Sequence, residues 1–535
     1  MNRRFFYILL SAVFFTGMTL NAQVKLIDSC ETDGWEYSGG AGKDSNGASL
    51  TCSIERGDCP EGDGRFRFVY SFGGGVAGGV ETVYWQRLFT DFRCDFSFCP
   101  KSLSLWVRGV PTNKGELRIV LLQGDMSSRF RHKVLQTYAY TDKKALRKSG
   151  WRKYNIPFNK FNPVGEESVP LDLSQVIGWR IEVVNADGTP SEGNVFEVDQ
   201  IEQNTTYRPR RNRNARLGSL IIQLDKSLYA DTDWDNVFMA NKKIGIDTWL
   251  IQFCIGRKSA WNCAYYKECT LPWVTEKLDY VDKMFAAAER CGMKLIVGPS
   301  YESWGHSWKL FREERYDEVF ETNRLVIDDI AASFASSKAF AGWYIANEFH
   351  DGSASAYNWW EEDANRLLAG YLERTAKYMK ALKDVPVSVS PALFRGFPAK
   401  MTGDMYDRLL SRTPSIDRLY IQDCAGRGGD MITSAGVDLP NYFTEIKKAC
   451  EKNGIKFCVN AESFFRCDIL RQERRPKTWD EFRRQLEVAG IFTDEITSFS
   501  WFSFQPGQET WEGYKKYIHR KAASQHEVQN SPEML

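Results

Sequence analysis

The second half of the chain alternates between short apolar runs and longer helix-like stretches, and this alternation restricts the fold more than any other feature. Eight runs have the length and composition of buried strands: residues 218–224, 247–254, 293–300, 340–348, 385–392, 416–423, 455–462 and 495–504. Helical stretches separate them, as in parallel sheets whose strands are joined by helices. About 300 residues of this kind suit one barrel of eight strand-helix units. We therefore predict an α/β fold, a (β/α)8 TIM barrel, over residues 217–520.

An open, doubly wound sheet is the alternative for such an alternation. That fold needs a glycine-rich phosphate turn after its first strand, and the residues that follow 224 contain none. Gly245 and Gly292 stand just before the second and third runs, where a left-handed glycine commonly ends a helix. These observations favour the closed barrel.

Residues 23–205 have the rhythm of an all-β domain. Short runs rich in β-branched and aromatic residues are separated by Gly, Pro, Asn and Asp, for example at 65–72, 102–109 and 116–124. This pattern predicts a β-sandwich of the jelly-roll kind. Residues 206–216 form a polar, basic linker, and residues 521–535 form a C-terminal tail.

Three segments of this region resemble the galactose-binding-like jelly rolls found beside carbohydrate-active enzymes. They are GWRKYNIPFNKF (150–161), LSQVIGWRIEVV (173–184) and FEVDQIEQ (196–203). The resemblance leaves two roles open for the sandwich: sugar binding and mechanical support of its neighbour.

The first 22 residues have the features of a secretory signal peptide. Arg3 and Arg4 form a positive start, residues 5–18 are apolar, and Ala22 closes a plausible cleavage site. The apolar stretch is too short for a membrane span. Because no cysteine stands at the cleavage site, a bacterial lipoprotein anchor is not indicated. We expect an exported protein, periplasmic or extracellular.

The composition argues against several classes of partner. The formal net charge is +1, and no run of Lys or Arg dominates, which disfavours nucleic acid and anionic membranes. The 13 cysteines are an odd number, and pairs such as Cys263 and Cys269 could form disulfides after export. With five histidines and no paired CxxC spacing, neither a metal nor another cofactor is indicated.

The residues at the ends of the eight predicted strands are the candidates for chemistry, because barrel enzymes place their sites there. The fourth strand ends in Asn347-Glu348 and the seventh ends in Glu462. Other polar or aromatic candidates at strand ends are Gln223, Asp225, Gln252, Ser300, Glu302, Gln422, Asp423 and Trp501.

Two glutamates at the mouth of a barrel suit the hydrolysis of glycosides. One carboxyl group protonates the leaving oxygen, and the other attacks the anomeric carbon or activates a water. A carboxylate separation of about 5–5.5 Å implies retention, whereas a wider gap implies inversion. Glu348 and Glu462 are therefore the predicted catalytic pair.

The Asn-Glu end of strand four, the Glu end of strand seven and the Trp of strand eight resemble clan A glycoside hydrolases. The resemblance implies that Glu348 is the acid/base and Glu462 the nucleophile. It also implies that Asn347 contacts the sugar 2-hydroxyl and that Trp501 is a sugar platform. Clan A enzymes often place an Arg on strand two and a Tyr on strand six. This sequence departs from both positions, since Arg257 lies beyond the end of strand two and Tyr420 precedes Gln422.

A second resemblance covers residues 217 to about 515. The ordered motifs GWYIANE, SVSPALF, DRLYIQDCAG and CVNAESF are similar to a bacterial domain-of-unknown-function family whose members are assigned as glycosidases with a TIM barrel. The usual Gln-Asp after strand six of that family is Gln422-Asp423 here. The family does not imply a particular sugar.

Several side chains have two readings. Gln422 and Asp423 either line the pocket and position Glu462, or belong to a turn. His350 either contacts substrate or lies in a surface loop. Glu302, near the end of strand three, could line the cleft. One or two of Trp304, Trp308, Trp359 and Trp360 could stack on sugars, although helix packing is the better explanation for any single one.

The leading hypothesis is a secreted, retaining O-glycoside hydrolase with a poly- or oligosaccharide substrate. The alternative is a non-catalytic glycan-binding protein on a degenerate glycosidase barrel, and a third option is another enzyme on the same fold. No nucleic-acid partner or membrane span is expected, and the sequence leaves the oligomeric state, sugar and linkage open.

Overall fold

The computed structural model describes most of the chain from residue 24 to residue 529. The described residues are 24–31, 37–42, 47–74, 80–89, 95–124, 133–165, 169–208, 210–257, 262–302, 313–351, 360–395, 397–426, 429–468 and 473–529. The signal peptide predicted for residues 1–22 lies outside them. Within these ranges, none of the helices combines the length and apolar character that crossing a bilayer requires.

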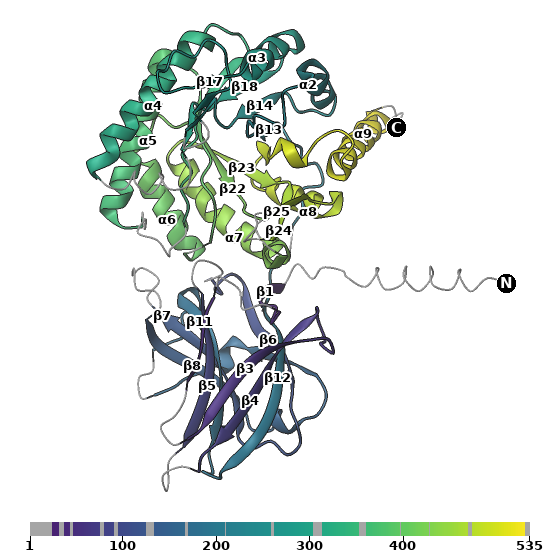
Figure 1. Cartoon of the computed structure of the whole chain (residues 1–535). Coiled ribbons are helices and arrows are strands. Elements are labelled where there is room, and N and C mark those ends of the chain that lie inside the picture. Colours follow the sequence, from purple (N-terminus) through teal and green to yellow (C-terminus); the bar gives the residue numbers. More distant parts are fainter. Residues whose placement is uncertain are drawn as a thin grey trace, which may run out of the picture.

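The N-terminal part is a β-sandwich, as predicted (Figure 1). One sheet contains β1 (Val24–Asp28), β3 (Ser49–Arg56), β4 (Gly64–Phe72), β6 (Pro100–Arg108), β9 (Arg152–Pro157) and β12 (Ser191–Thr205). The other contains β2 (Tyr37–Gly42), β5 (Glu81–Phe89), β7 (Glu116–Gly124), β8 (Val134–Asp142), β10 (Asn162–Pro163) and β11 (Val176–Asn185). All pairings are antiparallel, and an apolar core rich in aromatic rings fills the space between the sheets.

The C-terminal part confirms the predicted TIM barrel. Its closed parallel sheet contains β13 (Ser219–Ile222), β14 (Thr248–Ile251), β18 (Lys294–Val297), β20 (Phe340–Ile345), β21 (Val387–Val389), β22 (Arg418–Gln422), β23 (Lys456–Glu462) and β26 (Ile496–Phe499). Each strand lies within one of the eight runs identified in the sequence. The last strand pairs with the first through Ser219 and Thr497, so the sheet has no edge.

Helices surround the barrel (Figure 1). They are α2 (Trp234–Lys242), α3 (Tyr280–Cys291), α4 (Glu313–Phe334), α5 (Glu362–Leu382), α6 (Ala399–Leu410), α7 (Gly429–Lys452), α8 (Trp479–Ala489) and α9 (Glu509–Gln529). Gly292 ends α3 in the left-handed conformation, as its position before a strand predicted.

Short strands occupy some of the connections: β15 (Ile255–Arg257), β16 (Cys263–Ala264), β17 (Glu276–Lys277), β19 (Ser300–Glu302), β24 (Phe464–Asp468) and β25 (Glu473–Pro476). Cys263 and Cys269, whose spacing allowed a disulfide, both carry free thiols.

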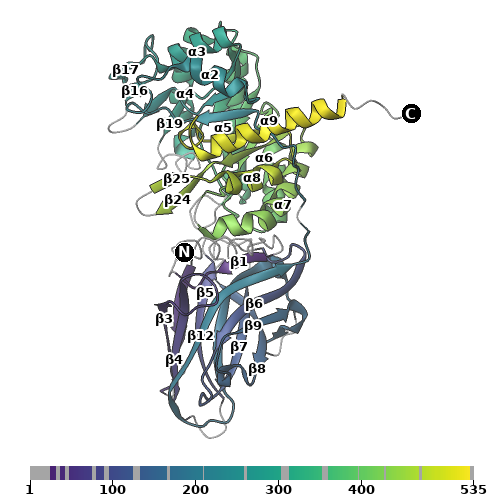
Figure 2. The same ribbon diagram turned by 90° about the vertical axis from the view of Figure 1, so that its right-hand side faces the viewer.

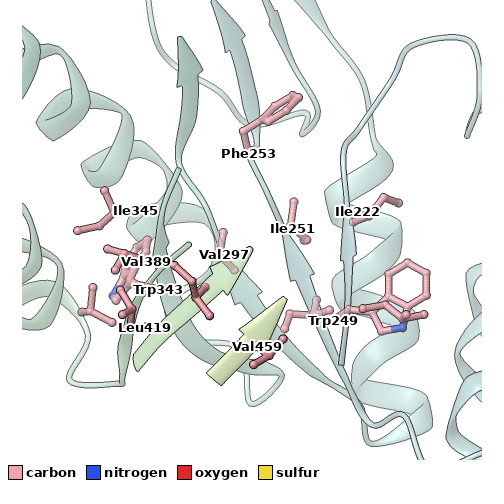
Figure 3. Packing of buried hydrophobic residues seen from close by; sticks show 14 of the residues in the cluster. Ile222, Trp249, Ile251, Phe253, Val297, Trp343, Ile345, Val389, Leu419 and Val459 are labelled. Atoms are coloured by element: carbon pink, nitrogen blue, oxygen red, sulfur yellow. The ribbon is translucent and has the colours of Figure 1, made fainter. Parts of the chain in front are cut away.

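Alternate residues of the barrel strands face opposite sides of the sheet. Ile222, Trp249 and Ile251 belong to the large core shared with the helices, and Figure 3 shows these side chains among others of that core. Ile221, Leu250, Ile296 and Tyr344, one position along each strand, form a separate apolar cluster with Ala346. This second cluster fills the barrel interior, so the polar residues at the strand ends rest on a packed floor.

The sandwich and the barrel meet through a buried charged contact. In Figures 1 and 2, β1 lies on the side of the sandwich that faces α7. The Lys25 side chain, in a residue only 1% exposed, places its Nζ atom 3.0 Å from Asp438 Oδ1 of α7 and donates to the Asp95 carbonyl oxygen. Asp95 Oδ2 accepts hydrogen bonds from the Ala399 N–H, which begins α6, and from Asn441 Nδ2. The sandwich and the barrel are therefore joined by specific buried contacts.

We predict that Lys25→Met destabilises the whole chain. Removing the ammonium leaves the buried Asp438 carboxylate with only the more distant Arg395 guanidinium, at 3.7 Å. Breaking a buried ion pair costs about 3–5 kcal/mol, and the remaining arginine places the expected loss at the lower end of that range. Urea denaturation of the full chain measures the loss. The control is Lys101→Met, an exposed lysine of the same sheet, for which a change within about 0.5 kcal/mol is expected. Equal stability of the two variants would refute the structural role of Lys25.

Candidate active site

Glu348 lies three residues beyond the end of β20 and is held by two glutamine side chains. Its Oε1 atom accepts hydrogen bonds from Gln252 Nε2 at 3.4 Å and from Gln422 Nε2 at 3.2 Å. Gln422 Nε2 also donates to the Ser390 carbonyl oxygen at 2.7 Å, which fixes its amide. Residues from strands β14, β20 and β22 thus converge at the C-terminal end of the barrel.

Glu462 is the last residue of β23 and is 6% exposed. Its Oε2 atom accepts a hydrogen bond from the Gly426 N–H at 2.7 Å. A Cβ atom on residue 426 would stand 2.9 Å from that oxygen and 2.4 Å from the Phe464 carbonyl oxygen. Glycine at this position therefore lets the backbone approach the carboxylate closely.

Asp423 ties the backbone of Glu462 to the strand end that also holds Glu348. It follows Gln422 directly, and its Oδ1 atom accepts hydrogen bonds from the Glu462 N–H at 3.2 Å and the Ala425 N–H at 3.1 Å. Consecutive residues of one strand end therefore contact Glu348 through Gln422 and the backbone of Glu462 through Asp423. Of the two readings of Gln422-Asp423, the structure supports a place in the site.

A buried lysine and glutamine stand behind Glu462. Lys477, 2% exposed, donates from Nζ to Gln485 Oε1 at 2.5 Å. Gln485 Nε2 in turn donates to Asp423 Oδ2 and, at 3.3 Å, to the Glu462 carbonyl oxygen. The backbone of Glu462 is thus held by polar contacts from Asp423, at the end of β22, and from Gln485 of α8.

Burial controls the electrostatics of this cluster. It raises the pKa of Glu462 to about 7, and the neighbouring Asp423 carboxylate adds to the effect while Lys477 opposes it. Burial also raises the pKa of Asp423 and lowers the pKa of Lys477. Such perturbed groups at the end of barrel strands are typical of functional sites.

Two further predicted residues have defined surroundings. Asn347 Oδ1 accepts a hydrogen bond from Tyr371 Oη at 2.6 Å, and Tyr371 also accepts from Asn323 Nδ2. The half-buried His350 ring stacks on Phe394, with 4.3 Å between the ring centroids. Both residues are held by the barrel, and His350 is packed rather than exposed on a surface loop.

The structure contradicts the prediction that Trp501 is a sugar platform. Trp501 is 4% exposed, and its ring centroid lies 4.8 Å from that of Trp249, a residue of the core between the barrel and the helices. The strand β26 ends at Phe499, and Trp501 belongs to the 3₁₀ turn Trp501–Ser503 that follows. This turn directs the indole into the core instead of the barrel mouth.

The remaining candidates are not brought into contact with the glutamates by any described interaction. Gln223 is half-buried just after β13, and Glu302 ends β19, its side chain lying outside the described part. Trp360 packs under the Arg408 guanidinium, whereas Trp304, Trp308 and Trp359 lie outside the described residues. Tyr420 lines a pocket of about 350 Å³ that also includes Asp247 and Ile496, at the opposite end of the barrel.

Sequence reasoning missed Gly426, Tyr371, Lys477 and Gln485. A signal existed for Gln485, because it stands on the apolar stripe of α8 with Phe482, Leu486 and Ala489. A polar residue at such a position must find a buried partner. The partners themselves come from distant segments, which a helical pattern does not identify.

Comparison with known proteins adds the family. Residues 218–510 match the family described as Domain of unknown function (DUF4434), which confirms the resemblance to a domain-of-unknown-function family. None of the curated proteins matches the sequence.

Several solved structures are similar. A candidate alpha-L-fucosidase of Bacteroides thetaiotaomicron is 21% identical over 59% of this chain and 97% of its own, with a TM-score of 0.46. The CBM22-1 and GH10 modules of a Clostridium thermocellum xylanase are 9% identical over 90% and 95%, with a TM-score of 0.33. A family 30 carbohydrate-binding module of Clostridium thermocellum is 14% identical over 32% and 92%, with a TM-score of 0.22. At these values the activity has to be argued from the site itself.

We predict that Gly426→Ala destabilises the chain by about 1–3 kcal/mol, the usual cost of overpacking. The new methyl group would push apart the Glu462 carboxylate and the Phe464 carbonyl. Urea denaturation provides the measurement. Gly218→Ala is the matched control, because a Cβ there meets no atom within 4 Å and its backbone is not left-handed. A Gly426→Ala variant as stable as this control would contradict the described packing.

Proposed function

The chain belongs to the DUF4434 family, and we propose that it is a glycoside hydrolase that cleaves O-glycosidic bonds of a poly- or oligosaccharide. The observation that carries the proposal is the placement of Glu348 and Glu462. Both stand at the C-terminal ends of barrel strands, and the Gln422-Asp423 pair contacts both. Two carboxyl groups facing one space are the chemical requirement of glycoside hydrolysis.

Glu348 is the proposed acid/base. Because its Oε1 atom already accepts two amide N–H groups, the proton of the acid form belongs on Oε2. In the first step that proton passes to the leaving-group oxygen as the glycosidic C–O bond breaks. In the second step Glu348 takes a proton from water, whose oxygen attacks the anomeric carbon.

Glu462 is the proposed nucleophile of a retaining mechanism. Its ionised carboxylate attacks the anomeric carbon and forms a glycosyl ester, which water later hydrolyses. The Gly426 N–H and the fixed backbone of Glu462 hold this carboxylate in one orientation. The consecutive residues Gln422 and Asp423 hold the Glu348 carboxylate and the Glu462 backbone at one strand end, which supports the proposal of a paired site.

The substrate and its location complete the proposal. Asn347, whose amide oxygen is engaged by Tyr371, would offer its Nδ2 group to a sugar hydroxyl. Gln252, Gln422 and His350 lie around the same strand ends and are the other proposed substrate contacts. We also propose that the protein is exported, on the strength of its N-terminal sequence, and acts in the periplasm or outside the cell.

We predict that Glu462→Gln and Glu348→Gln each lower kcat by at least about 100-fold, the lower end of what a general acid or base contributes. The measurement uses a panel of 4-nitrophenyl glycosides. The Glu348→Gln variant should lose less activity on 2,4-dinitrophenyl glycosides, since such a leaving group departs without a proton.

Glu495→Gln is the control, a carboxylate that lines the pocket at the opposite end of the barrel, and it should keep wild-type turnover. Full activity in both site variants would refute the assignment. Glycan binding by a wild-type protein that turns over no member of the panel would instead favour the non-catalytic alternative.

We predict that kcat/KM rises with pH through an acid limb near pH 7. The nucleophile must be ionised to attack, and burial with Asp423 raises the pKa of Glu462 to about 7. Activity is therefore lost as the pH falls through that value. A pH profile on the best aryl glycoside tests this. An acid limb at the ordinary glutamate value of 4.5 would contradict a raised pKa for the ionising nucleophile.

A further inference from the structure

Lys477 is buried close to Glu462 but has no role in the two reaction steps proposed above. It stands between β25 and α8, and its backbone is held on both sides. Its N–H donates to the Ser463 carbonyl oxygen at 2.9 Å, and its own carbonyl accepts from Thr510 Oγ1. Burying a lysine side chain costs folding free energy unless its charge is paired and hydrogen-bonded.

The Lys477 ammonium reaches Glu462 through a chain of polar contacts. Gln485 Oε1 accepts from Lys477 Nζ, and the Gln485 amide nitrogen donates to Asp423 Oδ2 and to the Glu462 carbonyl oxygen. Asp423 Oδ1 then accepts the Glu462 N–H. Both backbone polar groups of Glu462 are thereby tied to the same buried cluster.

The charges around the cluster come from several elements. Asp423 raises the pKa of Glu462, whereas Lys477 and Arg474 of β25 lower it. Lys477 itself faces Glu481, which raises its pKa, and Arg475, which lowers it. Glu481 and Arg475 form an ion pair of their own at 3.0 Å. Lys477 is therefore a buried cation that acts on both Asp423 and Glu462.

We propose that Lys477 is a positioning residue for Glu462: through Gln485 and Asp423 it orients the Glu462 backbone, and its charge keeps the carboxylate available in ionised form. The inference rests on the proposed nucleophilic role of Glu462. With two acidic groups and one ammonium in the cluster, one carboxylate is compensated. Loss of the ammonium would leave both carboxyl groups to hold protons to higher pH.

The test compares Lys477→Met, Lys477→Arg and the control Lys25→Met. Lys25 is an equally buried lysine at the contact between sandwich and barrel. For each protein, kcat and KM are measured from about pH 5 to about pH 9 on the 4-nitrophenyl glycoside that the wild type cleaves best.

Lys477→Met should move the acid limb upward by about one pH unit or more, the size of shift that a nearby charge produces. Its kcat should fall at neutral pH while KM changes little, and Lys477→Arg should return the limb toward the wild-type position. Lys25→Met should lower stability without moving the limb. An unmoved limb in Lys477→Met, with catalysis by the wild type intact, would overturn the inference and leave the proposed function standing.

A second readout needs no substrate. Thermal unfolding of the wild type and Lys477→Met is followed over the same pH range. Without the ammonium, the folded state holds protons that the unfolded chain releases, so the stability deficit of Lys477→Met should grow as pH rises. Adding Asp423→Asn should reduce that pH-dependent deficit. A stability deficit that does not change with pH would overturn the inference about Lys477, whether or not any glycoside is cleaved. Failure of the wild type to cleave any glycoside would count only against the proposed function.

Discussion

The Gln422-Asp423 end of β22 is the contact on which the candidate site depends. The strands that carry Glu348 and Glu462 are not neighbours, since β21 and β22 stand between them in the barrel. No hydrogen bonds between β20 and β23 can therefore set the relative position of the two carboxyl groups. The Gln422 amide holds one glutamate, and the Asp423 carboxylate holds the backbone of the other. The separation of the pair thus depends on one short piece of chain.

Stability alone does not explain the charges beside this contact. A buried ion pair or triad can often be replaced by apolar side chains without loss of stability, and sometimes with a gain. The cluster of Asp423, Glu462 and Lys477 keeps three ionisable groups buried, and burial shifts the pKa of each one. Chemistry offers a better reason for keeping it, because a nucleophile needs a carboxylate in a defined orientation and with a controlled charge.

Sequence reasoning located the strands and the two glutamates because barrel topology dictates where strand ends lie. Asp423 was also placed there, since it ends a strand. The prediction for Trp501 was wrong because β26 ends at Phe499, so that Trp501 belongs to the following 3₁₀ turn, where its ring packs against Trp249 in the core. Lys477 and Gln485 were missed because their partners lie far away in the sequence, and no local period encodes a contact between α8 and β22.

Lys25 and Lys477, both buried in the described part of the chain, have different surroundings. Lys25 contacts Asp438 directly at 3.0 Å, so its charge is neutralised where it stands, and the contact joins two domains. The direct side-chain partner of Lys477 is the neutral amide of Gln485. Its charge is therefore not neutralised by that partner and acts through the low-dielectric interior on Asp423 and Glu462. Because an amide can relay orientation without cancelling charge, Gln485 is the residue that distinguishes the second arrangement, which fits the proposed positioning of Glu462.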